Sequence, residues 1–126
     1  MDYLQFEVTG RRDGVVQTRL AGELDLASGS AVEVSLDQLL RASDAHMVVI
    51  DLSDLSYCDA AGLHVFSAAQ RDAAQRGKTI VLANPRGIVS VVLDTVQFER
   101  VVGIERSAGD GDPQASSGQS DVSESS

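Results

Sequence analysis

Residues 46–63 of this chain read HMVVIDLSDLSYCDAAGL. The run His46 to Leu52 is short, apolar and rich in β-branched residues, which predicts a strand buried on both faces. Asp59 then begins a helical segment, and its carboxylate is well placed as the N-cap. On that helix Leu63, Phe66, Ala69 and Ala73 share one face, and Gly77 ends it. This stretch therefore predicts a buried strand followed by a helix that packs on it.

Downstream, the same alternation continues to the end of the apolar sequence. Lys78 to Ala83 predicts a second buried strand, and Asn84-Pro85-Arg86 a turn. A short third helix is expected to bury Ile88, Val91, Val92 and Val96, and Val101 to Ile104 forms a last strand.

Upstream, the period of the apolar residues changes from two to that of a helix. Leu4, Phe6 and Val8, and then Val16, Thr18 and Leu20, alternate on either side of Asp13-Gly14. This predicts a β-hairpin, with Arg11-Arg12 lengthening its connection beyond the tightest turn. From Ser28 onward Val32, Leu36, Leu39 and Leu40 lie on one face of a helix of about four turns. Ser28 or Ser30 is expected to cap it, since Ser30 and Glu33 have the spacing of a capping box.

The expected order is β-β-α-β-α-β-α-β, an α/β fold with a mixed sheet whose later strands are parallel. Residues 1–106 are assigned to this domain. Residues 107–126 are rich in serine and glycine, carry four acids and have one large apolar residue, so a disordered acidic tail is expected there.

The formal charge of −9 argues against several classes of protein. The cations are scattered, so the basic patch of a nucleic-acid binder is missing. The apolar runs are too short to cross a membrane, and no secretory leader is recognisable, so the cytoplasm is expected. A lone cysteine, Cys58, gives no disulfide, and the two histidines, His46 and His64, do not make a metal site. Without a phosphate-binding loop or a nucleophile motif, neither an enzyme nor a cofactor is expected.

Two segments are more specific. Leu20-Ala-Gly-Glu-Leu-Asp25 leads into the first helix, and Asp51 to Leu63 leads into the second. Together with the element order from Leu4 to Ile104, they resemble the STAS family, the fold of bacterial anti-sigma factor antagonists. The resemblance implies that this chain has a surface that binds an anti-sigma factor of the serine kinase type. The implied contact residues are Glu23, Asp25, Ser28, Asp59, Ala60, Ala61, Gly62 and His64.

In that family the residue after the aspartate of the second motif is a serine, which the partner kinase phosphorylates to dissociate the complex. The equivalent residue here is Ala60, and Ala61 follows it, so a shift of one residue restores no hydroxyl. The resemblance thus implies an antagonist that stays competent to bind. Ser53, Ser56 or a redox-active Cys58 could serve as the switch instead. Their ordinary roles are those of serines that hydrogen-bond to the backbone and of a small buried hydrophobe. Likewise Gly22, Asp25 and Asp59 have simple local roles as a strand exit, a loop solvating group and a helix cap.

Other functions remain open at this point. A STAS subunit that docks on the ABC-type ATPase of a lipid-transport system needs no phosphoacceptor. A small-molecule or nucleotide sensor is the third possibility. When free, the protein is expected to be a monomer or a weak homodimer.

Overall fold

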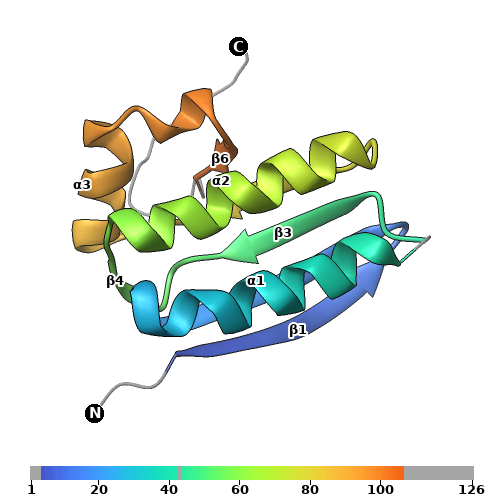
Figure 1. Cartoon of the computed structure of the whole chain (residues 1–126), viewed down its shortest axis with the longest axis horizontal. Coiled ribbons are helices and arrows are strands. Elements are labelled where there is room, and N and C mark those ends of the chain that lie inside the picture. Colours follow the sequence, from blue (N-terminus) through green and yellow to red (C-terminus); the bar gives the residue numbers. More distant parts are fainter. Residues whose placement is uncertain (1–3, 43, 107–126) are drawn as a thin grey trace.

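The computed structural model describes residues 4–42 and 44–106, so the predicted tail lies outside the described residues. The described chain forms one mixed sheet with helices, which confirms the expected α/β class (Figure 1). The strands are β1 (Gln5–Arg12), β2 (Val15–Leu24), β3 (Met47–Asp51), β4 (Leu55–Cys58), β5 (Thr79–Ala83) and β6 (Gly103–Glu105). The helices are α1 (Leu26–Arg41), α2 (Ala60–Gln75) and α3 (Gly87–Thr95), with a 3-10 turn η1 (Phe98–Arg100).

The β1–β2 hairpin is antiparallel and tighter than expected. Arg12 pairs with Val15, so the loop is only Asp13-Gly14, and the prediction that Arg11-Arg12 lengthen it is wrong. Both loop residues have positive φ, +54° and +80°. This backbone matches the twist of a two-residue hairpin, which lets the strands pair right up to the turn.

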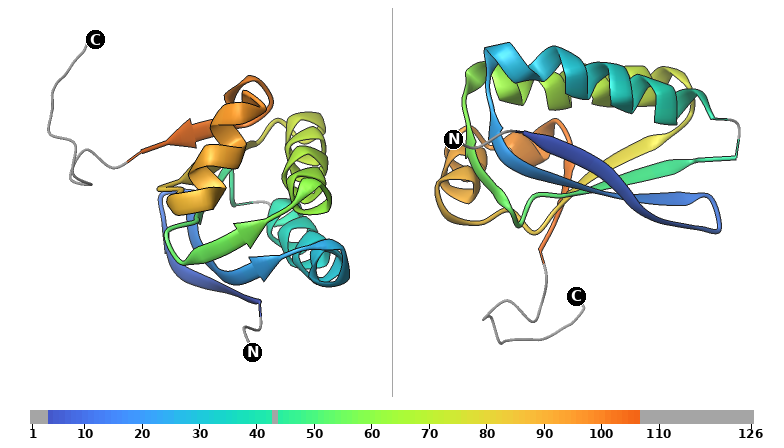
Figure 2. Two further views of the ribbon diagram at one scale, coloured as in Figure 1. Left: turned by 90° about the vertical axis from the view of Figure 1, so that its left-hand side faces the viewer. Right: turned by 90° about the horizontal axis from the view of Figure 1, so that it is seen from below.

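β2, β3, β5 and β6 run parallel in the order β1-β2-β3-β5-β6. Alternate residues of β3 and β5, such as Val48, Ile50, Ile80 and Leu82, are fully buried beneath the helices. Figure 2 shows α1 and α2 side by side over one face of the sheet. The core therefore lies between this helix pair and one face of the sheet.

The strand β4 was not expected from the sequence. Leu55 to Cys58 continues the parallel pairing of β2 beyond the end of β3, with Leu24 opposite Cys58. The register shifts at Gly22, whose φ of +105° only glycine adopts readily. Gly22 thus allows β2 to exchange one neighbouring strand for another.

The start of α1 also differs from the prediction. The N-cap is Asp25 rather than Ser28 or Ser30, and the helix begins at Leu26. Asp25 and Ser28 form the capping box, so the expected Ser30–Glu33 box is wrong. In α2, by contrast, the Asp59 cap is confirmed, and Gly77 with φ +70° follows its end as expected.

The buried face of α3 differs from the expected one, and of the four residues expected to be buried only Val92 is half-buried. Val89 and Leu93 are fully buried, whereas Ile88, Val91 and Val96 are about half exposed. This helix carries apolar residues on all sides, so their periodicity alone does not predict which face is buried. Packing against β4 and η1 makes that choice.

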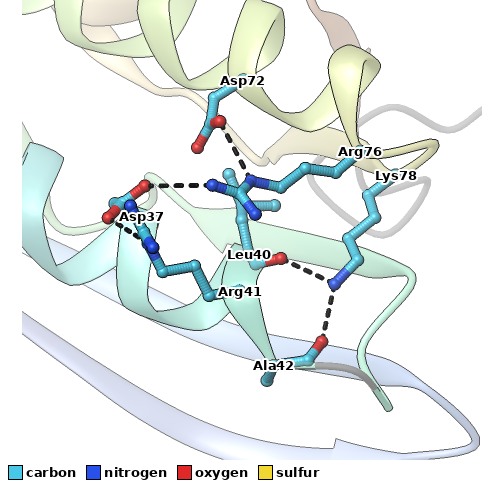
Figure 3. A network of polar contacts seen from close by, with 7 residues as sticks. All are labelled: Asp37, Leu40, Arg41, Ala42, Asp72, Arg76 and Lys78. Carbon is cyan, nitrogen blue, oxygen red and sulfur yellow. Dashed lines mark hydrogen bonds and ion pairs between the residues drawn. The ribbon is translucent and has the colours of Figure 1, made fainter.

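A polar network fixes α1 against α2 at the end where both helices finish (Figure 3). Arg76 lies 3.0 Å from Asp72 and 3.8 Å from Asp37, on the neighbouring helix. The Lys78 ammonium donates to the carbonyls of Leu40 and Ala42, at 2.6 Å each. A cation is favourable there because the last carbonyls of a helix have no partner within it. This network joins α1 to α2 and to Lys78, which follows α2.

Candidate partner-binding site

The two specific sequence segments meet at the end of the sheet where α1 and α2 begin (Figure 1). The pairing of β2 with β4 sets Glu23 beside Tyr57 and Leu24 beside Cys58. The Asp59 amide also donates to the Leu24 carbonyl at 3.4 Å. The connection from β2 to α1 and the one from β4 to α2 therefore form a single surface.

The Asp25 carboxylate is hydrogen-bonded within its own helix start. Its carboxylate accepts hydrogen bonds from the Ser28 amide at 3.1 Å and the Ser28 hydroxyl at 3.0 Å. These bonds stabilise the charged form and lower the pKa of Asp25 below its ordinary value. Its role is to cap α1, not to solvate a loop.

The start of α2 is built around Gly62. The Asp59 carboxylate accepts a hydrogen bond from the Gly62 amide at 2.9 Å. A Cβ on Gly62 would lie 2.8 Å from the Leu24 carbonyl oxygen and 2.7 Å from the Cys58 sulfur. Gly62 is buried, so its small size serves the contact between α2 and β2. Packing within the domain thus explains why this residue is a glycine.

Among the residues that the sequence assigned to partner contact, Glu23, Ala60 and His64 are exposed. Half-buried are Asp25, Ser28, Asp59 and Ala61. The exposed and the half-buried residues lie on one surface. No partner is present, so their assignment as contact residues stays a prediction. Ala60 is the first residue of α2, beside its capping aspartate.

Cys58 is a core residue. Its side chain is buried, and burial together with the neighbouring Asp59 charge raises the pKa of the thiol to about 12. A thiolate is therefore disfavoured at neutral pH, contrary to the lowered pKa that a redox switch requires. The alternative of a small buried hydrophobe agrees with the structure.

The two serines differ in the group that makes the hydrogen bond: the hydroxyl of Ser56 and the backbone amide of Ser53. The Ser56 hydroxyl donates to the Gly22 carbonyl at 2.9 Å and so joins β4 to β2. The Ser53 amide donates to Asp51 at 2.9 Å in the turn after β3. Ser56 therefore has a structural role across the two strands.

Sequence reasoning missed two exposed apolar residues on this surface. Leu26, at the first position of α1, is 81% exposed, and Tyr57 is 44% exposed. The only available signal was their position next to the motif residues Asp25 and Cys58. They supply apolar area beside the exposed Glu23.

Within residues 4–42 and 44–106, no group of three or more His, Cys, Asp and Glu side chains is placed to hold a metal ion. Over the same residues, no helix has the length and apolar character needed to cross a membrane.

The fold and this surface define a small α/β domain in which two strand-to-helix connections lie side by side and form one surface. The chain belongs to the STAS domain family, whose model matches residues 8–111. An anti-sigma F factor antagonist from Paenibacillus polymyxa is 29% identical over 91 residues, covering 72% of this chain and 77% of that protein.

Solved structures of other proteins share the fold. An anti-sigma factor antagonist from Mycobacterium paratuberculosis has a TM-score of 0.71 at 20% identity, covering 82% of this chain and 86% of that one. The phosphorylated form of the Bacillus cell fate determinant SpoIIAA has a TM-score of 0.62 at 17% identity. It covers 85% of this chain and 93% of the SpoIIAA chain.

Proposed function

We propose that this protein is an anti-sigma factor antagonist: a cytoplasmic binding protein, not an enzyme, that occupies a serine-kinase-type anti-sigma factor and so releases a sigma factor. The observation that carries the proposal is the pairing of Leu24 with Cys58, because it joins both family motifs in one surface. The name of the Paenibacillus polymyxa relative supports it. Of the contact residues that the proposal places on this chain, Glu23, Ala60 and His64 are exposed.

Ala60 makes the complex insensitive to the partner's kinase activity at this position. Phosphorylation adds nearly two negative charges and three acceptor oxygens, which disrupt a packed contact by repulsion and desolvation. A methyl side chain cannot carry that group. Ser56 is a poor substitute because its hydroxyl already bonds the Gly22 carbonyl. The antagonist therefore remains competent to bind while ATP is present.

The test is binding to the anti-sigma kinases of the same organism, with and without ATP. The wild type is expected to bind equally in both conditions, whereas Ala60→Ser is expected to bind without ATP and dissociate with it. Ala74→Ser is the matched control, since Ala74 is also exposed on α2 but lies near its other end. Failure to bind any such kinase would sink the proposal, and equal ATP sensitivity of wild type and Ala60→Ser would refute the role of Ala60.

Docking on an ABC-type ATPase is the competing function, since the missing phosphoacceptor suits it equally well. The relatives described above carry the names of anti-sigma factor antagonists or of a cell fate determinant, which does not favour it. Co-purification with such an ATPase in place of a kinase would decide for it.

A further inference from the structure

The sheet has a second face that the helices α1 and α2 leave uncovered (Figure 2). Side chains alternate along a strand, so the neighbours of the buried Val48 and Ile50 point to this outer face. On β3 these neighbours are Met47, Val49 and Asp51. Strand register aligns the outward residues in three rows. The first row is Arg12, Val15, Met47 and Thr79; the second is Gly10, Gln17, Val49, Val81 and Gly103; the third is Glu7, Arg19, Asp51, Ala83 and Glu105.

The centre of this face is apolar. Val15, Met47, Val49 and Val81, called here the outer patch, adjoin one another on three neighbouring strands and are half-buried. In the described chain, α3 packs on β4 and η1 rather than across β3 and β5. Parallel strands of this composition normally have both faces covered. Within residues 4–42 and 44–106, the outer patch therefore lacks the second layer that the sequence of β3 and β5 predicts.

Two glycines flank the middle row, and the protein's own packing does not explain them. A Cβ on Gly10 would meet nothing within 4 Å, and one on Gly103 would make only ordinary contacts at 3.9 Å. Neither glycine has a positive φ. Glycine within a strand often marks close approach by another backbone, although a bulge beside Gly10 also suits it. Gly103 in particular keeps that end of the row flat for an opposing sheet.

Two opposite charges on β1 lie where a second copy can bring them together. On β1, Arg12 lies in the first row and Glu7 in the third, with side chains 92% and 58% exposed. A two-fold axis that crosses the strands along the middle row exchanges the first and third rows between copies. Arg12 then lies over Glu7 of the second copy, and this pair forms twice. The same axis sets Arg19 over Val15 and Asp51 over Met47, which costs desolvation and keeps the association weak.

We propose that two copies of this protein associate weakly, outer patch against outer patch, about such an axis. Val49 then faces Val49 of the second copy. With strands about 4.8 Å apart and about 6.6 Å between rows, five strands and three rows cover roughly 500 Å² per copy. A stable interface needs about 800 Å² per partner, so the association is weak and depends on concentration. The starts of α1 and α2 remain free, and this inference is independent of the proposed function.

Sedimentation velocity of the full chain from about 1 µM to about 1 mM spans the affinities expected of so small an interface. The wild type is expected to shift from monomer to dimer across this range. Val49→Lys sets two lysines against each other at the axis and should raise the dissociation constant at least about 100-fold. Val34→Lys is the matched control, because Val34 is 58% exposed on α1, on the other side of the sheet.

A charge exchange tests the geometry of the pair. Arg12→Glu alone should weaken the dimer, and adding Glu7→Arg should restore it. A wild type that stays monomeric at every concentration would overturn the proposal, as would a Val49→Lys dimer of unchanged affinity. So would a melting temperature lowered far more by Val49→Lys than by Val34→Lys in dilute solution, since Val49 would then be covered within one chain.

Discussion

Gly62→Ala tests whether the start of α2 is packed as tightly as the structure indicates. The added Cβ would lie 2.7 Å from the Cys58 sulfur, 2.8 Å from the Leu24 carbonyl oxygen and 3.0 Å from the Leu24 side chain. Leu24 cannot move aside easily, because it is fully buried in a strand that also pairs with β4. We therefore expect a loss of stability although alanine is the better helix former.

The magnitude follows from two opposing effects. Overpacking a core site costs about 1–3 kcal/mol, and contact with a fixed backbone carbonyl favours the upper end of that range. Replacing glycine by alanine in a helix gains up to about 1 kcal/mol. The net loss is about 2 kcal/mol, or roughly 10 °C in melting temperature for a domain of this size.

Urea denaturation followed by circular dichroism measures this loss. Gly29→Ala is the matched control, because its Cβ would meet only a methyl group of Val65, at 2.9 Å. A side-chain methyl gives way more easily than a carbonyl, so we expect a smaller effect. Adding Cys58→Ala to Gly62→Ala removes the shortest contact and should cost less than the sum of the single changes. Wild-type stability of Gly62→Ala would refute the reasoning.

Three further predictions concern the same surface. Asp25→Asn should retain the α1 cap near neutral pH. Because the folded pKa of Asp25 lies below its ordinary 3.8, the charged carboxylate stabilises the fold above that value and loses this effect as the pH falls through the folded pKa. Thermal melts below a pH of about 4 should therefore decline more steeply for wild type than for Asp25→Asn, and parallel curves would contradict this. Asp59→Ala should lower the free energy of unfolding by about 1 kcal/mol in urea titrations, and no change would remove the cap from the account. Cys58 should react with iodoacetamide only after denaturation, because the thiol is buried and its pKa is raised to about 12; rapid labelling of the folded protein would show that it is accessible.

Local patterns predicted most of the elements. The alternation around Asp13-Gly14 gave the hairpin, and the helical spacing of Val32, Leu36 and Leu40 gave the inner face of α1. These predictions succeed because each depends on a period or turn that neighbouring residues define by themselves. The cap at Asp59 succeeds for the same reason.

Degenerate patterns led to the errors. Asp25, Ser28 and Ser30 are all good cap residues, and the path of β2 decides that Asp25 is the cap. Leu55 to Cys58 is too short to show a strand period, so β4 exists through its pairing with β2. The candidate site shares this limit, since Leu26 and Tyr57 show no pattern that marks them as exposed.

By itself, the sequence determined the order of the elements apart from β4, the mixed sheet and the Asp59 cap. Only the tertiary structure decided that Cys58 is a core residue, that Gly62 is required by Leu24, and that α3 buries Val89 and Leu93. Residue periods report which side chains prefer to be buried. They do not report which residues a buried side chain packs against, because that depends on contacts between residues far apart in the chain, such as Leu24 and Cys58.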